Sequence, residues 1–238
     1  MPAASLEIAG LCAGYGPTRV LEDISFAAEA GRRLAVLGRN GMGKSTLFAT
    51  MAGQTKRYSG AIRLGGEAIE GMGSSARALK GLGYVPQSRD VFPTLTVEEN
   101  LFVGLKGRPR MAIEEAYTMF PRLRERRRNL GSQLSGGEQQ MLTTARTILG
   151  QPSVLLLDEP LEGLAPVICE ELMTAFGTLA ASGEMTILIV EQRIQSALDF
   201  AEDVLILERG RIAWTGTPAA LAADRHTVEA LLGVGGLR

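Results

Sequence analysis

Residues 38–46 read GRNGMGKST, and residues 33–37 directly before them read RLAVL, which after the arginine has the apolar composition of a buried strand. A helix is predicted from Lys44 to about residue 52, because apolar side chains recur there at helical spacing. The order strand, glycine-rich loop, helix is typical of a phosphate-binding loop. Glycines let consecutive backbone N–H groups turn inward, and the positive end of the helix dipole adds to the attraction for an anion.

The loop fits the pattern G-x-x-x-x-G-K-[ST], which predicts a nucleotide site. Lys44 can reach the β and γ oxygens of a triphosphate, and the hydroxyl of Ser45 can bind Mg²⁺. The alternative is an ordinary glycine turn before a helix, and a chance match in a chain of this length occurs about once in a hundred. The loop residues that we expect to bind the nucleotide are Gly38, Arg39, Asn40, Gly41, Met42, Gly43, Lys44, Ser45 and Thr46.

A second apolar run ends in two acidic residues. Residues 154–157 read VLLL and are followed by Asp158 and Glu159. Asp158 is expected to hold the coordination shell of Mg²⁺, and Glu159 to accept the proton of an attacking water. The pair could instead cap the next helix, but the phosphate loop elsewhere in the chain favours catalysis. Lys44 and Glu159 are therefore predicted catalytic residues.

A tyrosine between two glycines, Tyr15, follows the predicted strand at residues 6–11. An aromatic ring on a bare turn can stack on the face of an adenine. A buried core tyrosine is the alternative. We expect Tyr15 to lie at the nucleotide base.

Composition excludes several classes of protein. The 238 residues include 25 Lys+Arg, 26 Asp+Glu and 45% apolar residues, which predicts a folded chain with a buried core. A net charge of −1 gives no overall electrostatic case for nucleic acid, and the basic run at residues 122–128 reads as a solvated helix face. With two cysteines, no apolar stretch of about 18 residues and no signal-like start, we expect a chain of a reducing cytosol without a membrane span.

The second half of the chain alternates apolar strands with helices, which predicts an α/β fold with a largely parallel sheet covered on both faces. Residues 91–128 are helical in pattern instead, with a capping box at Thr96 and Glu99 and a second helix at about residues 111–120. This stretch is interpreted as a helical insertion.

Residues 134–138 read LSGGE, and Ser135 lies 23 positions before Asp158. This segment resembles the signature sequence of ATP-binding cassette proteins, with Glu in place of the last residue of the commoner form. Ser135 and Glu138 can also cap the helix that starts there. The resemblance implies a P-loop NTPase core with a mostly parallel sheet, an N-terminal antiparallel β subdomain and an inserted α-helical subdomain. It implies one domain, residues 1–238, with the core at 1–87 and 151–238 and the helical subdomain at about 88–150.

The same resemblance assigns further residues. Gln87, in the segment YVPQ, is implied to sense the γ-phosphate and Mg²⁺, so the implied metal ligands are Ser45, Gln87 and Asp158. Gln192 stands where the family usually has histidine, and its amide can donate to the γ-phosphate but cannot titrate near neutral pH. Leu161 stands where serine or threonine is commoner. The only histidine, His226, is expected on the surface.

Family members sandwich two ATP molecules between two chains. The resemblance therefore implies that Ser135, Gly136 and Gly137 complete the phosphate site of a second ATPase subunit, identical or different. The implied cofactors are ATP and Mg²⁺.

Residues 120–123 (FPRL), 138–142 (EQQML), 162–166 (EGLAP) and 190–192 (VEQ) resemble the ATPase subunits of bacterial importers for branched-chain and other hydrophobic amino acids. The implied partners are transmembrane permease subunits and, indirectly, a periplasmic or extracellular substrate-binding protein, with no nucleic acid. The implied location is the cytoplasmic face of the bacterial inner membrane. The permease is expected to dock between the core and the inserted helices, near Gln87 and residues 91–99. Phe92 and Leu95 are either apolar contacts of the permease or residues of the core.

Other functions stay open at this point. An importer of urea or short amides would share much of the pattern. A soluble cassette ATPase acting on DNA or on cofactor assembly would usually carry long inserts or tandem cassettes, which this chain lacks. A non-hydrolysing binding module is disfavoured because Lys44, Ser45, Asp158 and Glu159 are all present.

Overall fold

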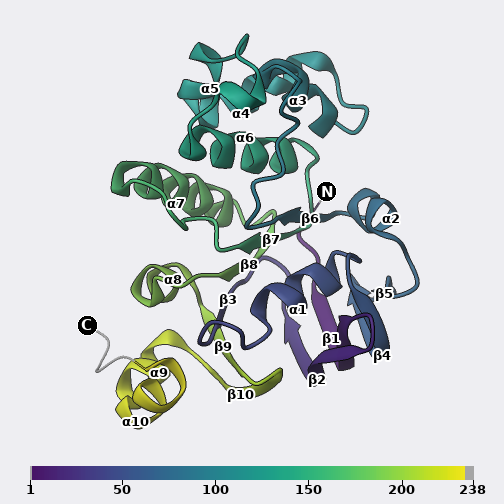
Figure 1. The fold of residues 1–238 in the computed structure, drawn as a ribbon, viewed down its shortest axis with the longest axis vertical. Helices are drawn as coiled ribbons and strands as arrows, with labels where there is room; N and C mark the ends of the chain where they lie inside the picture. Colours follow the sequence, from purple (N-terminus) through teal and green to yellow (C-terminus); the bar gives the residue numbers. More distant parts are fainter. Residues whose placement is uncertain (1, 234–238) are drawn as a thin grey trace.

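A computed structural model describes residues 2–233 and shows two sheets, a group of helices at one end and a pair of short helices near the C-terminus (Figure 1). The strands are β1 (Leu6–Tyr15), β2 (Thr18–Ala28), β3 (Arg33–Leu37), β4 (Lys56–Leu64), β5 (Glu67–Ala68), β6 (Leu82–Val85), β7 (Val154–Asp158), β8 (Thr186–Val190), β9 (Asp203–Glu208) and β10 (Arg211–Gly216). The helices are α1 (Lys44–Met51), α2 (Ser74–Leu79), α3 (Val97–Gly104), α4 (Ile113–Met119), α5 (Pro121–Glu125), α6 (Gly136–Leu149), α7 (Pro166–Ala181), α8 (Ile194–Phe200), α9 (Pro218–Ala223) and α10 (Arg225–Thr227).

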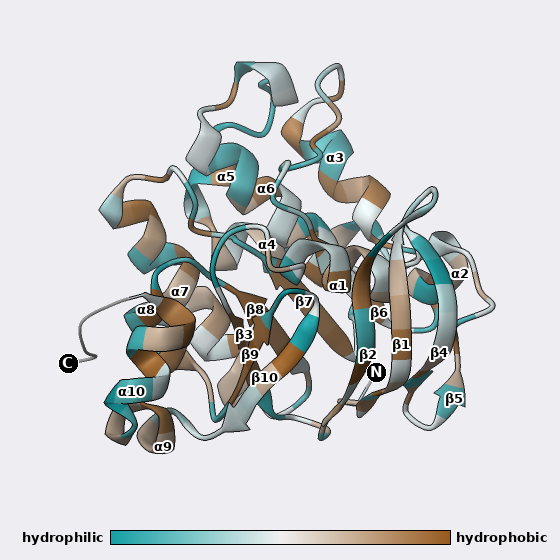
Figure 2. Cartoon of the chain, turned by 60° about the horizontal axis from the view of Figure 1, so that its bottom comes forward, coloured by the Kyte–Doolittle hydropathy of each residue, from teal (hydrophilic) through white to brown (hydrophobic). Residues whose placement is uncertain are grey.

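The central sheet has six strands in the order β10-β9-β3-β8-β7-β6. All neighbouring pairs are parallel except β9 and β10. Parallel strands that are covered on both faces are nearly continuous apolar runs, and Figure 2 shows β3, β7, β8 and β9 as a hydrophobic centre. The predicted, largely parallel sheet is confirmed.

The two faces of this sheet belong to two hydrophobic clusters, because successive side chains of a strand point to opposite sides. Leu156 and Leu188 pack with α1 and with the four-stranded sheet β2-β1-β4-β5. Leu155 and Ile189 pack with α6, α7 and α8. The N-terminal sheet is antiparallel, as the predicted fold class requires.

Helices α3 to α6 form the group at the top of Figure 1. Both predicted capping boxes are present: Thr96 and Glu99 start α3, and Ser135 and Glu138 start α6. Each box satisfies backbone N–H groups that a helix start leaves without partners. The division of the chain at residues 87 and 151 stays a prediction.

Several predicted boundaries were wrong. The helix expected at about residues 111–120 is a 3₁₀ turn, Arg110–Ala112, followed by α4, and Phe120 leaves the helix with φ −131° because the next residue is proline. Strand β1 runs on to Tyr15, which pairs with Thr18 and so does not lie on the turn itself. Helix α2 and the short strand β5 were not predicted, and each is too brief for a periodic pattern.

Within residues 2–233, no helix is both long enough and apolar enough to cross a bilayer. The helices that surround the sheet are mixed in character, with hydrophilic residues on their outer sides (Figure 2).

Candidate nucleotide site

The loop between β3 and α1 needs its glycines. Gly38, Gly41 and Gly43 have φ values of 142°, 80° and 102°, a region that side chains strongly disfavour. A Cβ on Gly38 would lie 2.4 Å from the carbonyl oxygen of Leu207, and one on Gly43 would lie 2.9 Å from a methyl carbon of Leu21. The loop is therefore pressed against β9 and β2, and only glycine fits at these two positions.

Lys44 occupies the centre of this loop. Its ammonium Nζ donates to the carbonyl oxygens of Gly38 at 2.8 Å and Arg39 at 3.1 Å. Burial lowers the pKa of Lys44, while the nearby carboxylates of Glu159 and Asp158 act in the opposite direction. A buried ammonium held by two carbonyl oxygens is well placed to exchange them for phosphate oxygens.

A cavity of about 340 Å³ lies beside the loop. Its lining brings together residues predicted from four separate parts of the sequence, the phosphate loop, Gln87, Glu159 and Gln192. The lining residues are Val20, Asn40, Gly41, Gly43, Lys44, Ser45, Thr46, Gln87, Glu159, Glu162 and Gln192.

Asp158 lies at the end of β7 and is 1% exposed. Ser45 Oγ donates to its Oδ1 at 3.0 Å, and the hydroxyl of Tyr84 donates to its Oδ2 at 3.2 Å. Burial raises the pKa of Asp158 to about 6, although the hydrogen bonds from Ser45 and Tyr84 act in the opposite direction and lower it. A buried carboxylate beside a hydroxyl oxygen fits a hard cation such as Mg²⁺, which prefers oxygen ligands and retains waters and phosphate oxygens.

Glu159 has a strained backbone, with φ 48° in the left-handed region. This conformation turns its carboxylate from the strand end toward the cavity, where Oε2 accepts a hydrogen bond from Gln192 Nε2 at 2.6 Å and from Gln87 Nε2 at 3.2 Å. A non-glycine residue held in this region at a strand end is a frequent mark of a functional site.

Some predicted residues lie outside this cavity. Gly38 and Arg39 line an adjoining cavity of about 440 Å³. The side chain of Met42 points into the core, and its sulfur accepts a hydrogen bond from the backbone N–H of Arg209. Tyr15 is 53% exposed, so the core alternative is wrong for it. Its place at a nucleotide base stays a prediction.

The signature segment is also outside the cavity. Ser135 Oγ accepts from the backbone N–H of Glu138, and Ser135 N–H donates to the Glu138 carboxylate at 2.8 Å. A Cβ on Gly136 would lie 2.6 Å from the guanidinium of Arg89. Within residues 2–233, Ser135, Gly136 and Gly137 thus serve the start of α6 and do not line the cavity.

Three polar residues at the site, Tyr84, Glu162 and Glu191, were not predicted from the sequence. Tyr84 lies on β6 and pairs with Leu156 of the neighbouring strand β7, and this pairing places its hydroxyl within reach of Asp158 at the end of β7. Glu162 lines the cavity, and the buried Glu191 accepts a hydrogen bond from the backbone N–H of Leu161 at 2.9 Å. Their positions depend on strand neighbours and turns that spacing along the chain does not reveal.

Replacing Glu191 by glutamine is expected to stabilise the protein at alkaline pH. Burial raises the pKa of Glu191 from 4.5 to about 7, so ionisation opposes folding as the pH rises through this interval. Below about pH 4.5 the group is protonated in both states and the variant gains nothing, whereas above about pH 7 the gain approaches ~3 kcal/mol. Glutamine keeps an oxygen for the Leu161 N–H. Urea unfolding at pH 5 and pH 8 measures the difference, and an equal gain at both would contradict the prediction.

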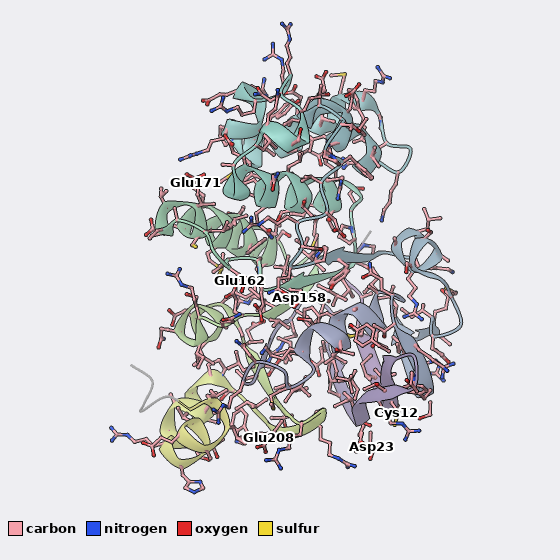
Figure 3. The ribbon with its side chains drawn as sticks, in the orientation of Figure 1. Cys12, Asp23, Asp158, Glu162, Glu171 and Glu208 are labelled. Atoms are coloured by element: carbon pink, nitrogen blue, oxygen red, sulfur yellow. The ribbon has the colours of Figure 1, made fainter. Side chains whose placement is uncertain are left out.

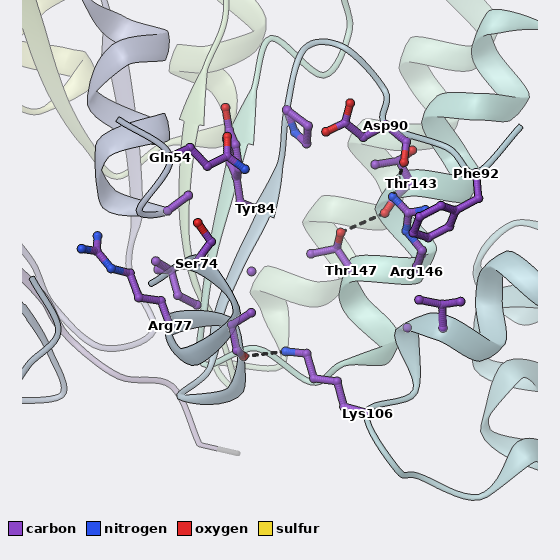
Figure 4. Close-up of a pocket in the computed structure, with 17 residues that line it drawn as sticks. Gln54, Ser74, Arg77, Tyr84, Asp90, Phe92, Lys106, Thr143, Arg146 and Thr147 are labelled. Atoms are coloured by element: carbon purple, nitrogen blue, oxygen red, sulfur yellow. Dashed lines mark hydrogen bonds between the residues drawn. The ribbon is translucent and has the colours of Figure 1, made fainter. Parts of the chain in front are cut away.

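A further cavity, of about 310 Å³, lies between the helical group and the rest of the molecule (Figure 4). Phe92, Arg146 and Lys106 lie on the side of α3 and α6, and Gln54, Arg77 and Tyr84 line the opposite side. Phe92 is exposed and lines the groove, with the Arg146 guanidinium 4.7 Å from its ring centre. Leu95 is half-buried and is not among the lining residues, and its contact with a permease stays a prediction.

The sequence also matches known proteins. The family description "ABC transporter" matches residues 21–162. The high-affinity branched-chain amino acid transport ATP-binding protein BraG of Pseudomonas aeruginosa is 40% identical, over 92% of this chain and 95% of that protein. A probable branched-chain amino acid transport ATP-binding protein, LivF of Archaeoglobus fulgidus, is 35% identical over 94% and 97%. The lipopolysaccharide export system ATP-binding protein LptB of Escherichia coli is 31% identical over 97% and 98%.

The fold has close counterparts among solved structures. An ATP binding subunit of an ABC transporter superposes with a TM-score of 0.82 at 26% identity, covering 96% of each chain. The phosphate loop, the buried Asp158 and Glu159 meet at one site in this fold. The chain belongs to the ABC transporter family and is one of its ATPase cassettes.

Proposed function

We propose that this chain is the ATP-hydrolysing subunit that energises a membrane importer for branched-chain or other hydrophobic amino acids. The hydrolytic part is supported by one arrangement above all: Glu159 shares a cavity with Lys44 and Ser45. The amino-acid part is supported by the similarity to BraG and LivF. LptB, a lipopolysaccharide export protein by its name, is 31% identical, so the cassette alone does not define the transported molecule.

In the proposed reaction Lys44 exchanges its carbonyl partners for β- and γ-phosphate oxygens, and the loop N–H groups hold the rest of the triphosphate. Ser45, Asp158 and Gln87 would hold Mg²⁺, which neutralises charge on the phosphates when bound. Glu159 accepts the proton of the attacking water, and the amide of Gln192 donates to the γ-phosphate. Because Gln192 does not titrate, donation from this position is independent of pH near neutrality.

The proposed working form is a dimer with a second ATPase subunit. Ser135, Gly136 and Gly137 sit at the start of α6, away from the cavity of their own chain, and a helix start with small residues can bind the phosphates of another chain. ATP between two chains would then join them.

The groove of Figure 4 is the proposed docking site of the transmembrane permease subunits. Its walls come from both the helical group and the sheet, so a helix seated there would contact both. This contact would hold the chain at the cytoplasmic face of the inner membrane, with a substrate-binding protein on the other side.

An uptake assay tests the proposal. A strain that lacks this chain is supplied with the wild-type gene, or with Lys44→Ala, and the entry of radiolabelled leucine and urea is measured. The wild type is expected to restore leucine entry and Lys44→Ala to leave it at background. Restored urea entry without leucine entry would favour the amide importer, and no uptake of either would contradict an importer for these solutes.

A further inference from the structure

The carboxylate of Glu162 engages both amides that the proposed reaction uses. Gln87 Nε2 donates to Glu162 Oε2 at 2.5 Å, and Gln192 Nε2 lies 3.4 Å from Glu162 Oε1. The same two nitrogens donate to Glu159. Figure 3 labels Glu162 and Asp158 close together in the middle of the molecule. Each amide is therefore held between two carboxylates.

The backbone fixes Glu162 in this position. Its N–H donates to the carbonyl oxygen of Glu159 at 3.2 Å, which closes a tight turn, and Gly163 follows with φ 66°. Arg89 Nη2 donates to the carbonyl oxygen of Glu162 at 3.1 Å. The hydroxyl of Thr143 on α6 donates to the carbonyl oxygen of Arg89, so the turn is tied to the helical group.

A γ-phosphate would compete with this arrangement. An amide nitrogen carries two N–H donors, and on Gln192 both face carboxylates. A phosphate can gain a donor only if a carboxylate gives one up, and its negative charge is repelled by both acids. Glu162 is the exposed member of the pair, whereas Glu159 is buried, so Glu162 is the group that can turn out into water.

We propose that Glu162 is a positioning residue that holds the amides of Gln87 and Gln192 in the nucleotide-free protein and releases them when the γ-phosphate arrives. The inference rests on the proposed function, because it assumes that ATP binds beside Lys44. Glu162 thereby sets how strongly the site prefers ATP to ADP, since only ATP brings a third phosphate to these amides.

The test is to replace Glu162 by glutamine and to measure the dissociation constants of ATP and ADP by calorimetry in EDTA, so that no magnesium-dependent hydrolysis occurs. Loss of the negative charge weakens the hold on both amides. The dissociation constant for ATP is expected to fall about fivefold to tenfold and that for ADP to change less than about twofold. Glu170→Gln, an exposed neutralisation on α7, is the matched control and should change neither.

A second pair of variants shows whether Glu162 acts through the amides. In a chain with Gln87→Met and Gln192→Met, which keep side-chain length and lose the donors, adding Glu162→Gln should leave the ratio of ATP to ADP affinity unchanged. A persistent effect there would mean that Glu162 repels phosphate directly and would overturn the inference, as would equal gains for ATP and ADP. Wild-type protein that binds no ATP would overturn both this inference and the proposed function, whereas tight ATP binding with an unchanged ratio in Glu162→Gln would overturn this inference alone.

Discussion

Lys44→Ala should abolish measurable ATP hydrolysis and raise the dissociation constant for ATP by at least about 100-fold. The ammonium of Lys44 is buried in the loop and bonded to two carbonyl oxygens, so it already stands where phosphate oxygens would replace them. Each hydrogen bond to a charged group contributes about 1.5–3 kcal/mol, and every 1.4 kcal/mol is a factor of ten in affinity. Calorimetric titration with ATP and a phosphate-release assay measure the two effects.

Two controls separate a local effect from misfolding. Lys80→Ala removes an exposed lysine that pairs with Glu67, and it should leave binding and hydrolysis unchanged. Lys44→Arg keeps the charge but places a larger planar group in a loop pressed against β9, so it should bind ATP more weakly than wild type. If Lys44→Ala kept normal ATP affinity with an unchanged circular-dichroism spectrum, the phosphate-loop interpretation would be refuted.

Most of the fold could be predicted because the sequence patterns are local. Strand β3, Arg33–Leu37, has the predicted bounds, and β7, Val154–Asp158, contains the predicted apolar run 154–157, since each is a short and mainly apolar segment. The capping boxes at Thr96 and Ser135 fixed the starts of two helices for the same reason. The order of the strands in the sheet is a tertiary property, and no pattern of residues 1–238 specified it.

The site divides in the same way. The phosphate loop is one short segment of the sequence and the pair Asp158–Glu159 is another, so each could be recognised locally. The structure brings the two segments together as expected. Tyr84, Glu162 and Glu191 escaped prediction because their contacts join separate strands and turns. Leu161 was predictable in one respect and not in another. The sequence shows that it departs from the family pattern, but only the structure shows that its side chain is buried and that its N–H donates to Glu191.

Glu159→Gln should stop hydrolysis while leaving ATP bound. A positioned general base contributes about 10²–10⁴-fold to a rate, so phosphate release should fall by about that factor. Glutamine has the shape of glutamate and keeps an oxygen that can accept from Gln192 and Gln87, so the cavity should stay intact. Removing one negative charge beside the phosphates should make ATP binding equal to wild type or tighter.

The consequence for assembly makes this variant more informative than a simple loss of activity. If ATP joins two chains through Ser135, Gly136 and Gly137, an unhydrolysed nucleotide should hold them together, and sedimentation with magnesium and ATP should show dimers that ADP does not support. Glu170→Gln, which neutralises an exposed carboxylate on α7, should hydrolyse ATP normally and dimerise only transiently. Monomers of Glu159→Gln at high protein concentration with saturating ATP would rule out the sandwich, because this variant removes the step that would otherwise separate the chains. Hydrolysis at the wild-type rate would instead mean that another group takes the proton, and Glu162, whose carboxylate lines the same cavity, would be the next residue to replace.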